Sequence, residues 1–183
     1  MVFVFYEKFA VTRPFIRPSI FHNRTASIYL SAFLHGVVVL SLLYYLPLYY
    51  EAVKELSPTK AGLALFPETF SVAPACIIMG LLVSHTGNYR RGIWTGWLLT
   101  TVGAGLLCLL DVNTSTVKWI FLNIVGGIGI GILYSAMSFA IQASASASGE
   151  DSWFAIAMFS FFRSLGTVCS FPFHLLKIIS DFQ

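Results

Sequence analysis

Gly80-Leu-Leu-Val-Ser-His-Thr-Gly-Asn-Tyr-Arg-Arg91 separates two long apolar runs of the chain and decides how they are arranged. Gly87 is suited to the left-handed conformation that ends a helix, and Gly80 lacks a side chain where a neighbouring helix can approach. Tyr89 suits the headgroup level, and the paired arginines at the end cannot lie in hydrocarbon. Paired cations in a short loop favour the cytoplasmic side. The stretch therefore predicts a tight cytoplasmic hairpin between two membrane helices.

The composition is that of a membrane protein with several spans. Hydrophobic residues make up 57% of the chain and charged residues 10%, whereas a soluble domain has about 25% charged residues. The formal net charge of +3 is small and its carriers are dispersed, which argues against a nucleic-acid partner. Cys76, Cys108 and Cys169 all lie in apolar runs, so we interpret them as buried small residues rather than a disulfide framework. No metal-binding spacing and no cofactor motif occur.

The apolar runs predict an all-α, polytopic transmembrane bundle. A helix needs about 20 apolar residues to cross the bilayer core, and five runs approach or exceed this length. We place the spans at about residues 26–50, 61–84, 92–110, 119–141 and 153–176. Pro67 and Pro74 interrupt the second span, so we expect that helix to be kinked or locally open. Ser57 is the expected N-cap of this span, with Pro58 at its first helical position.

Loops counted alternately from the hairpin give the topology. The loop 11–25, which carries three arginines, and the loop 142–151 fall on the cytoplasmic side. The near-neutral loops 51–60 and 111–118 then lie outside. Residues 1–10 make a poor signal peptide, because they have no basic start and no cleavage site. Two interpretations of them stay open, the tail of a span whose beginning is missing and an interfacial segment.

Glycines crowd the fourth predicted span. Gly127-Ile-Gly-Ile-Gly131 fits the small-xxx-small pattern that lets helix backbones touch. We interpret it as a helix-packing surface. These glycines lie in hydrocarbon, so they cannot serve as a phosphate-binding loop.

The hairpin also carries a family signature. Gly80-x-Leu82-x-x-x-x-Gly87-x-Tyr89-Arg90 resembles the Gly-x-Leu-x-Asp-x-x-Gly-x-x signature of the major facilitator superfamily, in the copy found in the second half of its members. Further stretches resemble the fourteen-span drug:proton antiporter branch found in fungi. They are Tyr6–Lys8, Phe21–Thr25, Phe33–Gly36, Tyr45–Tyr50, Leu56–Gly62, Leu65–Pro67, Trp94–Trp97 and Ala157–Arg163.

The resemblance implies a partial major facilitator fold. Residues 1–166 correspond to most of the second half of such a transporter, and residues 167–183 form a divergent tail. The chain is therefore expected to be cut at both ends. Ser84 stands where the signature usually has its acid, and His85 replaces a basic residue. Both departures weaken a charge relay and leave helix packing by Gly80 and Gly87 as the expected role of this copy.

Polar side chains within the predicted spans each have two interpretations. Glu68 either carries a coupling proton, because burial disfavours the charged carboxylate, or is a hydrogen-bonded acid that stabilises the kink. His35 either gates or accepts a proton, or is a helix-packing histidine. Arg163 either faces a cavity or an anionic group, or pairs with a carbonyl or acid of a neighbouring helix. Asn123 and Gln142 more often bridge helices than bind substrate.

No enzyme constellation is present, neither a Ser/His/Asp arrangement nor a phosphate-binding loop. The function implied by the resemblance is proton-coupled efflux of small, mostly apolar molecules, with protons and small-molecule substrates as partners if the chain is completed. The alternatives are a non-transporting membrane fragment or interaction subunit, which would self-associate, and, less favoured, an unrelated membrane enzyme. The expected location is a membrane crossed several times, with plasma membrane and vacuolar membrane both left open.

Overall fold

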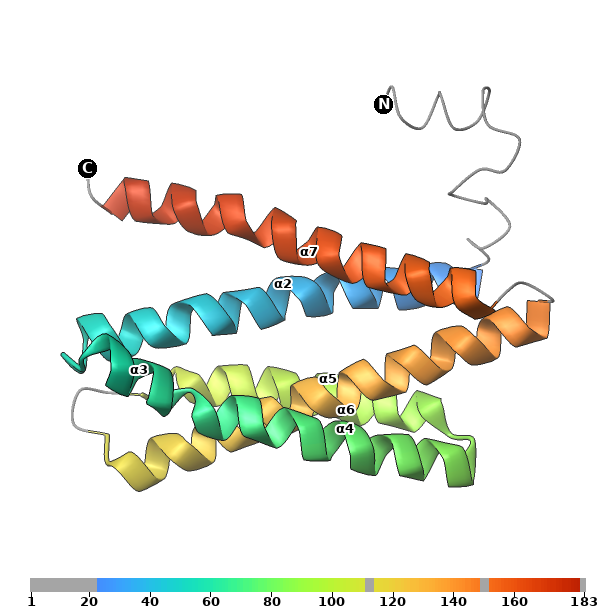
Figure 1. The fold of residues 1–183 in the computed structure, drawn as a ribbon, viewed down its shortest axis with the longest axis horizontal. Helices are drawn as coiled ribbons and strands as arrows, with labels where there is room; N and C mark the ends of the chain where they lie inside the picture. The colour runs from blue at the N-terminus through green and yellow to red at the C-terminus, as the bar shows by residue number, and fades with distance from the viewer. Residues whose placement is uncertain (1–22, 111–113, 149–151, 182–183) are drawn as a thin grey trace.

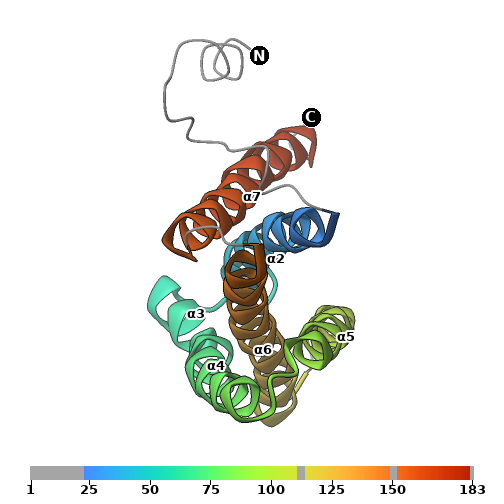
Figure 2. The ribbon, with the colours of Figure 1, turned by 90° about the vertical axis from the view of Figure 1, so that its right-hand side faces the viewer.

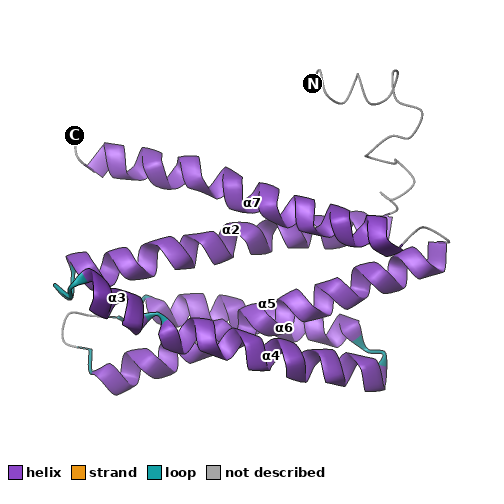
Figure 3. Ribbon diagram, in the orientation of Figure 1, coloured by secondary structure: helices purple, strands orange, loops and turns teal. Residues whose placement is uncertain are grey.

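The computed structural model describes residues 23–110, 114–148 and 152–181. Every regular element in these ranges is a helix (Figures 1 and 3). The elements are α2 (Asn23–Ala52), α3 (Pro58–Ala64), α4 (Phe66–Thr86), α5 (Tyr89–Leu107), α6 (Thr116–Ser148) and α7 (Ser152–Asp181). The predicted all-α class is confirmed.

Four of the described helical stretches are long and apolar enough to cross a membrane. They are Thr25–Ala52, Pro58–Thr86, Thr116–Ala145 and Ser152–Phe171. Helix α5, which occupies the third predicted span, is not among the four. Its 19 residues are long enough, but the two arginines in its first turn lower its mean hydropathy.

Helix α6 is the element around which the others pack. It lies against both α4 and α5, whereas α2 packs mainly on α7. Smaller contacts of α6 with α2 and α7 join the two groups, and the end-on view shows α6 between them (Figure 2). The largest core cluster forms where α2, α6 and α7 meet, around Tyr29, Leu133, Met137 and Phe159, each at most 2% exposed. The bundle therefore has its best-buried core on α6.

Helix ends follow local sequence closely at the hairpin and less closely elsewhere. Gly87 ends α4 with a φ of 67°, and its N–H donates to the Val83 carbonyl (2.8 Å). Ser57 occupies the N-cap of α3, although its side chain forms no capping hydrogen bond. The predicted interruption of the second span lies at Leu65, between α3 and α4. Pro67 is in the first turn of α4, where a missing N–H breaks no helical bond, so only Pro74 lies inside the helix.

Three helices extend into segments predicted as loops or tail. Helix α2 begins at Asn23, α6 continues to Ser148, and α7 continues to Asp181. The start of α2, the α4–α5 hairpin and the end of α6 lie at one end of the bundle, as alternate loop counting requires (Figure 1). The α2–α3 connection and the start of α6 lie at the other end. Residues 1–22, 111–113 and 149–151, on which several loop predictions fall, lie outside the described residues.

Candidate functional site

Polar contacts follow one face of α6. Asn123, Ile130 and Tyr134 are spaced by seven and four residues, which places them on the same side of the helix. Asn123 donates from Nδ2 to the Tyr50 hydroxyl of α2 (2.7 Å). The Ile130 carbonyl lies 3.3 Å from His35 Nε2 of α2. Tyr134 lies beneath Arg163 of α7. The face therefore gathers the polar side chains of two neighbouring helices.

His35, Tyr134 and Arg163 form one cluster, which we call the arginine cluster. The Arg163 Cζ atom lies 4.8 Å from the centre of the Tyr134 ring, a cation–π geometry. The His35 and Tyr134 ring centres are 6.3 Å apart. The Arg163 Nε atom is enclosed by protein, so this part of the guanidinium faces the interior of the bundle. The structure thus brings together two of the three ionisable residues singled out from the sequence.

Glu68, the third of these residues, lies in a second group. It is in the first turn of α4 and is 6% exposed. Its carbonyl lies against Gly127, one helical turn from Asn123 on α6. Ser71 donates to the Glu68 carbonyl (2.8 Å) and so supports the first turns of α4. Asn123 also donates to the Ala64 carbonyl of α3 (3.4 Å), so it bridges α6 to α2 and α3.

The glycines of α6 bring two helices close. A Cβ at Gly127 would clash with the Glu68 carbonyl and Ser71 Oγ, and a Cβ at Gly131 would lie 2.9 Å from the Ala75 Cβ. On the other side of α6, a Cβ at Gly129 would lie 2.6 Å from the Thr100 backbone nitrogen of α5. Glycine is thus required here because helix backbones touch on two faces.

The hairpin signature behaves differently from this glycine surface. A Cβ at Gly80 would meet Ser135 Oγ at 3.5 Å and Phe139 at 3.6 Å, which are ordinary contacts, so the close approach expected there does not occur. Leu82 is 52% exposed and Arg90 is exposed. Tyr89 packs partly buried on the cluster of Met79, Val83 and Ala136. Gly87 alone among these residues has a conformation that a side chain would strain.

One close helix crossing was missed by the sequence analysis. A Cβ at Gly36 of α2 would clash with the Arg163 carbonyl, and a Cβ at Gly166 of α7 would clash with the Phe33 carbonyl. The signal that points to it is the small-xxx-small spacing of Ala32 with Gly36 and of Gly166 with Ser170. Because this crossing includes the backbone of Arg163, it positions the arginine cluster.

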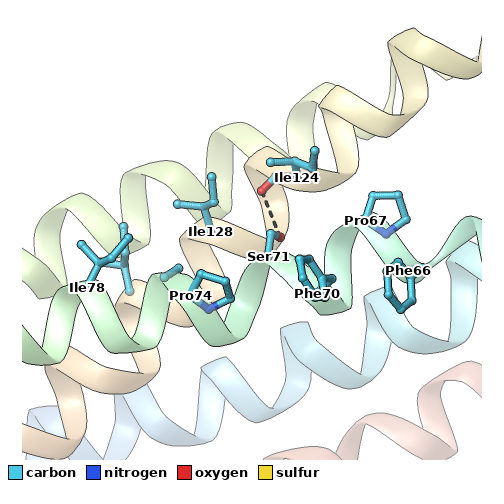
Figure 4. Close-up of a pocket in the computed structure, with 10 residues that line it drawn as sticks. Phe66, Pro67, Phe70, Ser71, Pro74, Ile78, Ile124 and Ile128 are labelled. Atoms are coloured by element: carbon cyan, nitrogen blue, oxygen red, sulfur yellow. Dashed lines mark hydrogen bonds between the residues drawn. The ribbon is translucent and has the colours of Figure 1, made fainter.

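An apolar groove runs between α4 and α6 (Figure 4). Its cavity volume is about 390 Å³. The Phe66 and Phe70 rings stack at 5.3 Å on one side, and Ile124, Ile128 and Ile132 line the other. Ser71 Oγ donates to the Ile124 carbonyl (3.4 Å) across it. None of the groove's lining residues belongs to the arginine cluster, so apolar and charged surfaces are separate.

The similarity of this chain to known proteins identifies its family. Residues 5–170 match the family described as Major Facilitator Superfamily. The chain is 53% identical over 161 residues to MFS transporter L2 of a Phoma species, covering 87% of this chain and 26% of that protein. It is 36% identical over 157 residues to MFS-type efflux pump MMF1 of Pseudozyma antarctica, covering 85% of this chain and 29% of that protein. No solved structure matches the chain significantly.

The match covers most of this chain but only a part of each relative. The chain spans about a quarter of the length of the curated relatives it matches. These relatives are named transporters and efflux pumps, not enzymes. Together with four apolar helices long enough to cross a bilayer, they show a multi-pass membrane protein of a transporter family. The predicted family is confirmed, and the chain belongs to the Major Facilitator Superfamily.

Proposed function

We propose that this chain is part of an exporter that couples the efflux of small, mostly apolar molecules to protons. Relatives named efflux pumps support the direction of transport. The observation that carries the coupling is Glu68, which is 6% exposed within a stretch long and apolar enough to cross the membrane. Intramembrane carboxyl groups are costly and mark proton pathways in transporters. The groove between α4 and α6 is a surface of matching chemistry for an apolar substrate body.

Glu68 has the surroundings that a coupling acid requires. Its backbone is held against Gly127 by close helix packing, and its carbonyl accepts a hydrogen bond from Ser71. Closed packing disfavours a charged carboxylate, so a conformation that buries Glu68 retains a proton and a conformation that hydrates it releases one. Rocking of two helical bundles about a midplane site alternates these two conditions. Proton movement and substrate movement are then coupled through the same helix pair, α4 and α6.

The test is Glu68→Gln in a full-length transporter that contains this segment. Glutamine keeps the shape and hydrogen-bonding capacity of the side chain but has no titratable proton. We expect normal protein levels and loss of the pH dependence of efflux, measured with a fluorescent apolar substrate in proteoliposomes. Glu51→Gln is the matched control, because Glu51 is an exposed acid at the end of α2. Unchanged pH-dependent efflux in Glu68→Gln would make Glu68 a structural residue.

The alternative is a non-transporting membrane fragment or interaction subunit. Alternating access uses two bundles, and the chain spans about a quarter of the length of its relatives. We expect self-association in the membrane where it buries polar groups that lipid cannot solvate, such as Arg163. Proteoliposomes containing only the 183-residue chain separate the two functions. Proton-driven efflux by that chain would require an assembly of identical copies. It would reject the interpretation of the chain as a non-transporting fragment.

A further inference from the structure

The arginine cluster has unused hydrogen-bonding capacity inside the bundle. Arg163 Nε and His35 Nδ1 are both enclosed by protein and have no hydrogen-bond partner. His35 is 1% exposed. Among the residues that the structure describes, no carboxylate forms an ion pair with Arg163, whose guanidinium lies over the Tyr134 ring. A cation in apolar surroundings is costly without a counter-charge. The cluster is therefore incomplete without an anionic or strongly polar group.

We propose that the arginine cluster binds the carboxyl group of a substrate whose remaining body is apolar. This proposal rests on the proposed export function and defines its substrate class as amphipathic carboxylic acids. The fork of N–H donors on a guanidinium matches the two oxygens of a carboxyl group. The Tyr134 ring lies against the guanidinium, whose Nε has no hydrogen-bond partner.

His35 favours a carboxyl group over other anions. The Ile130 carbonyl accepts only, so the His35 Nε2 atom facing it carries the ring proton. In the neutral ring, Nδ1 is then an acceptor that needs a donor. A carboxylate accepts from Arg163 with one oxygen and, when it binds together with a proton, shares that proton with Nδ1 through the other oxygen. A sulfate or sulfonate is a much weaker base, so it would not share a proton and would leave Nδ1 unsatisfied.

The position of the cluster agrees with a substrate site. His35, Tyr134 and Arg163 lie near the middle of the stretches Thr25–Ala52, Thr116–Ala145 and Ser152–Phe171, which are long enough to cross the membrane. Transporter substrate sites lie near the bilayer midplane. Tyr134 is 37% exposed whereas Arg163 Nε and His35 Nδ1 are enclosed, so a ligand would enter past the Tyr134 ring. The close crossing at Gly36 and Gly166 fixes the position of the Arg163 backbone.

The test compares two probes that differ only in the carboxyl group. The 183-residue chain is placed in nanodiscs of uncharged-headgroup lipid and titrated with 1-pyrenebutyrate and 1-pyrenebutanol. Energy transfer from tryptophan to pyrene reports binding, and empty nanodiscs correct for partition into lipid. We expect the acid to bind about tenfold more tightly than the alcohol, the effect of a hydrogen bond to a charged group. Arg163→Met should abolish this preference, whereas Arg91→Met, at an exposed arginine of the hairpin, should retain it.

Arg163→Lys keeps the proposal testable if the methionine variant aggregates. Lysine retains the charge but lacks the fork, so the preference for the acid should weaken while the alcohol binds as before. Equal affinity of the wild-type chain for both probes would overturn the proposal. An equal loss of affinity for both probes in Arg163→Met would also overturn it. Because the assay measures binding alone, selective binding without efflux in the full-length transporter would reject the exporter function and leave the carboxyl site in place.

Discussion

Two adjacent glycines of α6 have opposite surroundings. A Cβ added at Gly127 would clash with the Glu68 carbonyl, whereas a Cβ added at Gly126 meets nothing within 4 Å. Both are fully helical, so alanine raises the intrinsic helix propensity at each by the same amount. The difference between the two substitutions therefore isolates the close packing of α6 on α4.

Gly127→Ala should destabilise the chain, and Gly126→Ala should not. Forcing a methyl group into a filled helix contact costs about 1–3 kcal/mol, and it would move the first turn of α4 that carries Glu68. The measurement is thermal unfolding in detergent, followed by tryptophan fluorescence. We expect a lower midpoint for Gly127→Ala and an unchanged or slightly higher one for Gly126→Ala. Equal midpoints for the two variants would contradict the observed α4–α6 contact.

At the scale of elements, α2 and α7 form a reciprocal crossing. Gly36 of α2 lies against the backbone of α7, and Gly166 of α7 lies against the backbone of α2. Further along the same pair, the Ser41 and Ser170 hydroxyls are 3.4 Å apart. This crossing holds Arg163 opposite His35, so the arginine cluster depends on one helix pair being docked correctly.

Cysteines at Ser41 and Ser170 should form a disulfide. The two hydroxyl oxygens are 3.4 Å apart, so sulfur atoms at these positions can approach each other. The three native cysteines are first replaced by alanine, since Cys169 adjoins one of the positions. Mild oxidation should then change the gel mobility of Ser41→Cys/Ser170→Cys in a way that reduction reverses. Ser41→Cys/Ser160→Cys is the control, because Ser160 is exposed on α7. Cross-linking in the control alone would mean that α7 is rotated about its axis relative to the structure.

At the scale of the whole molecule, the helices alternate in direction, and their ends gather at two sides of the bundle (Figure 1). The side with the α4–α5 hairpin carries Arg90 and Arg91, both exposed. The opposite side carries the α2–α3 connection, where Glu51, Glu55 and Lys60 are exposed. The structure gives this grouping, and the positive-inside bias predicts its orientation, with the arginines in the cytoplasm.

Cysteine labelling in intact cells tests that orientation. In a background without the native cysteines, Asn88→Cys at the hairpin and Glu55→Cys in the α2–α3 connection are both exposed positions. An impermeant maleimide should label Glu55→Cys in intact cells and Asn88→Cys only after the membrane is permeabilised. The reverse pattern would invert the topology and place the paired arginines outside.

Much of the architecture follows from sequence because it depends on composition and local chemistry. Apolar runs without charges must form helices in a bilayer, since each helix satisfies its own backbone hydrogen bonds. Gly87 ends α4 because the left-handed conformation there suits glycine. The hairpin signature and the stretches around it also sufficed to recognise the family. Glu68, His35 and Arg163 stand out in sequence because ionisable groups are rare within spans.

The sequence by itself thus determined the class, the helices and the family, whereas the tertiary structure alone decided which residues meet. The grouping of His35 and Arg163 around Tyr134, and of Asn123 with Tyr50, depends on how each helix is rotated about its axis. Rotation is set by where backbones touch, at Gly36 and Gly166 rather than at Gly80. These contacts join positions far apart in the chain, and many apolar faces of similar hydropathy compete for them, so local periodicity does not select among them.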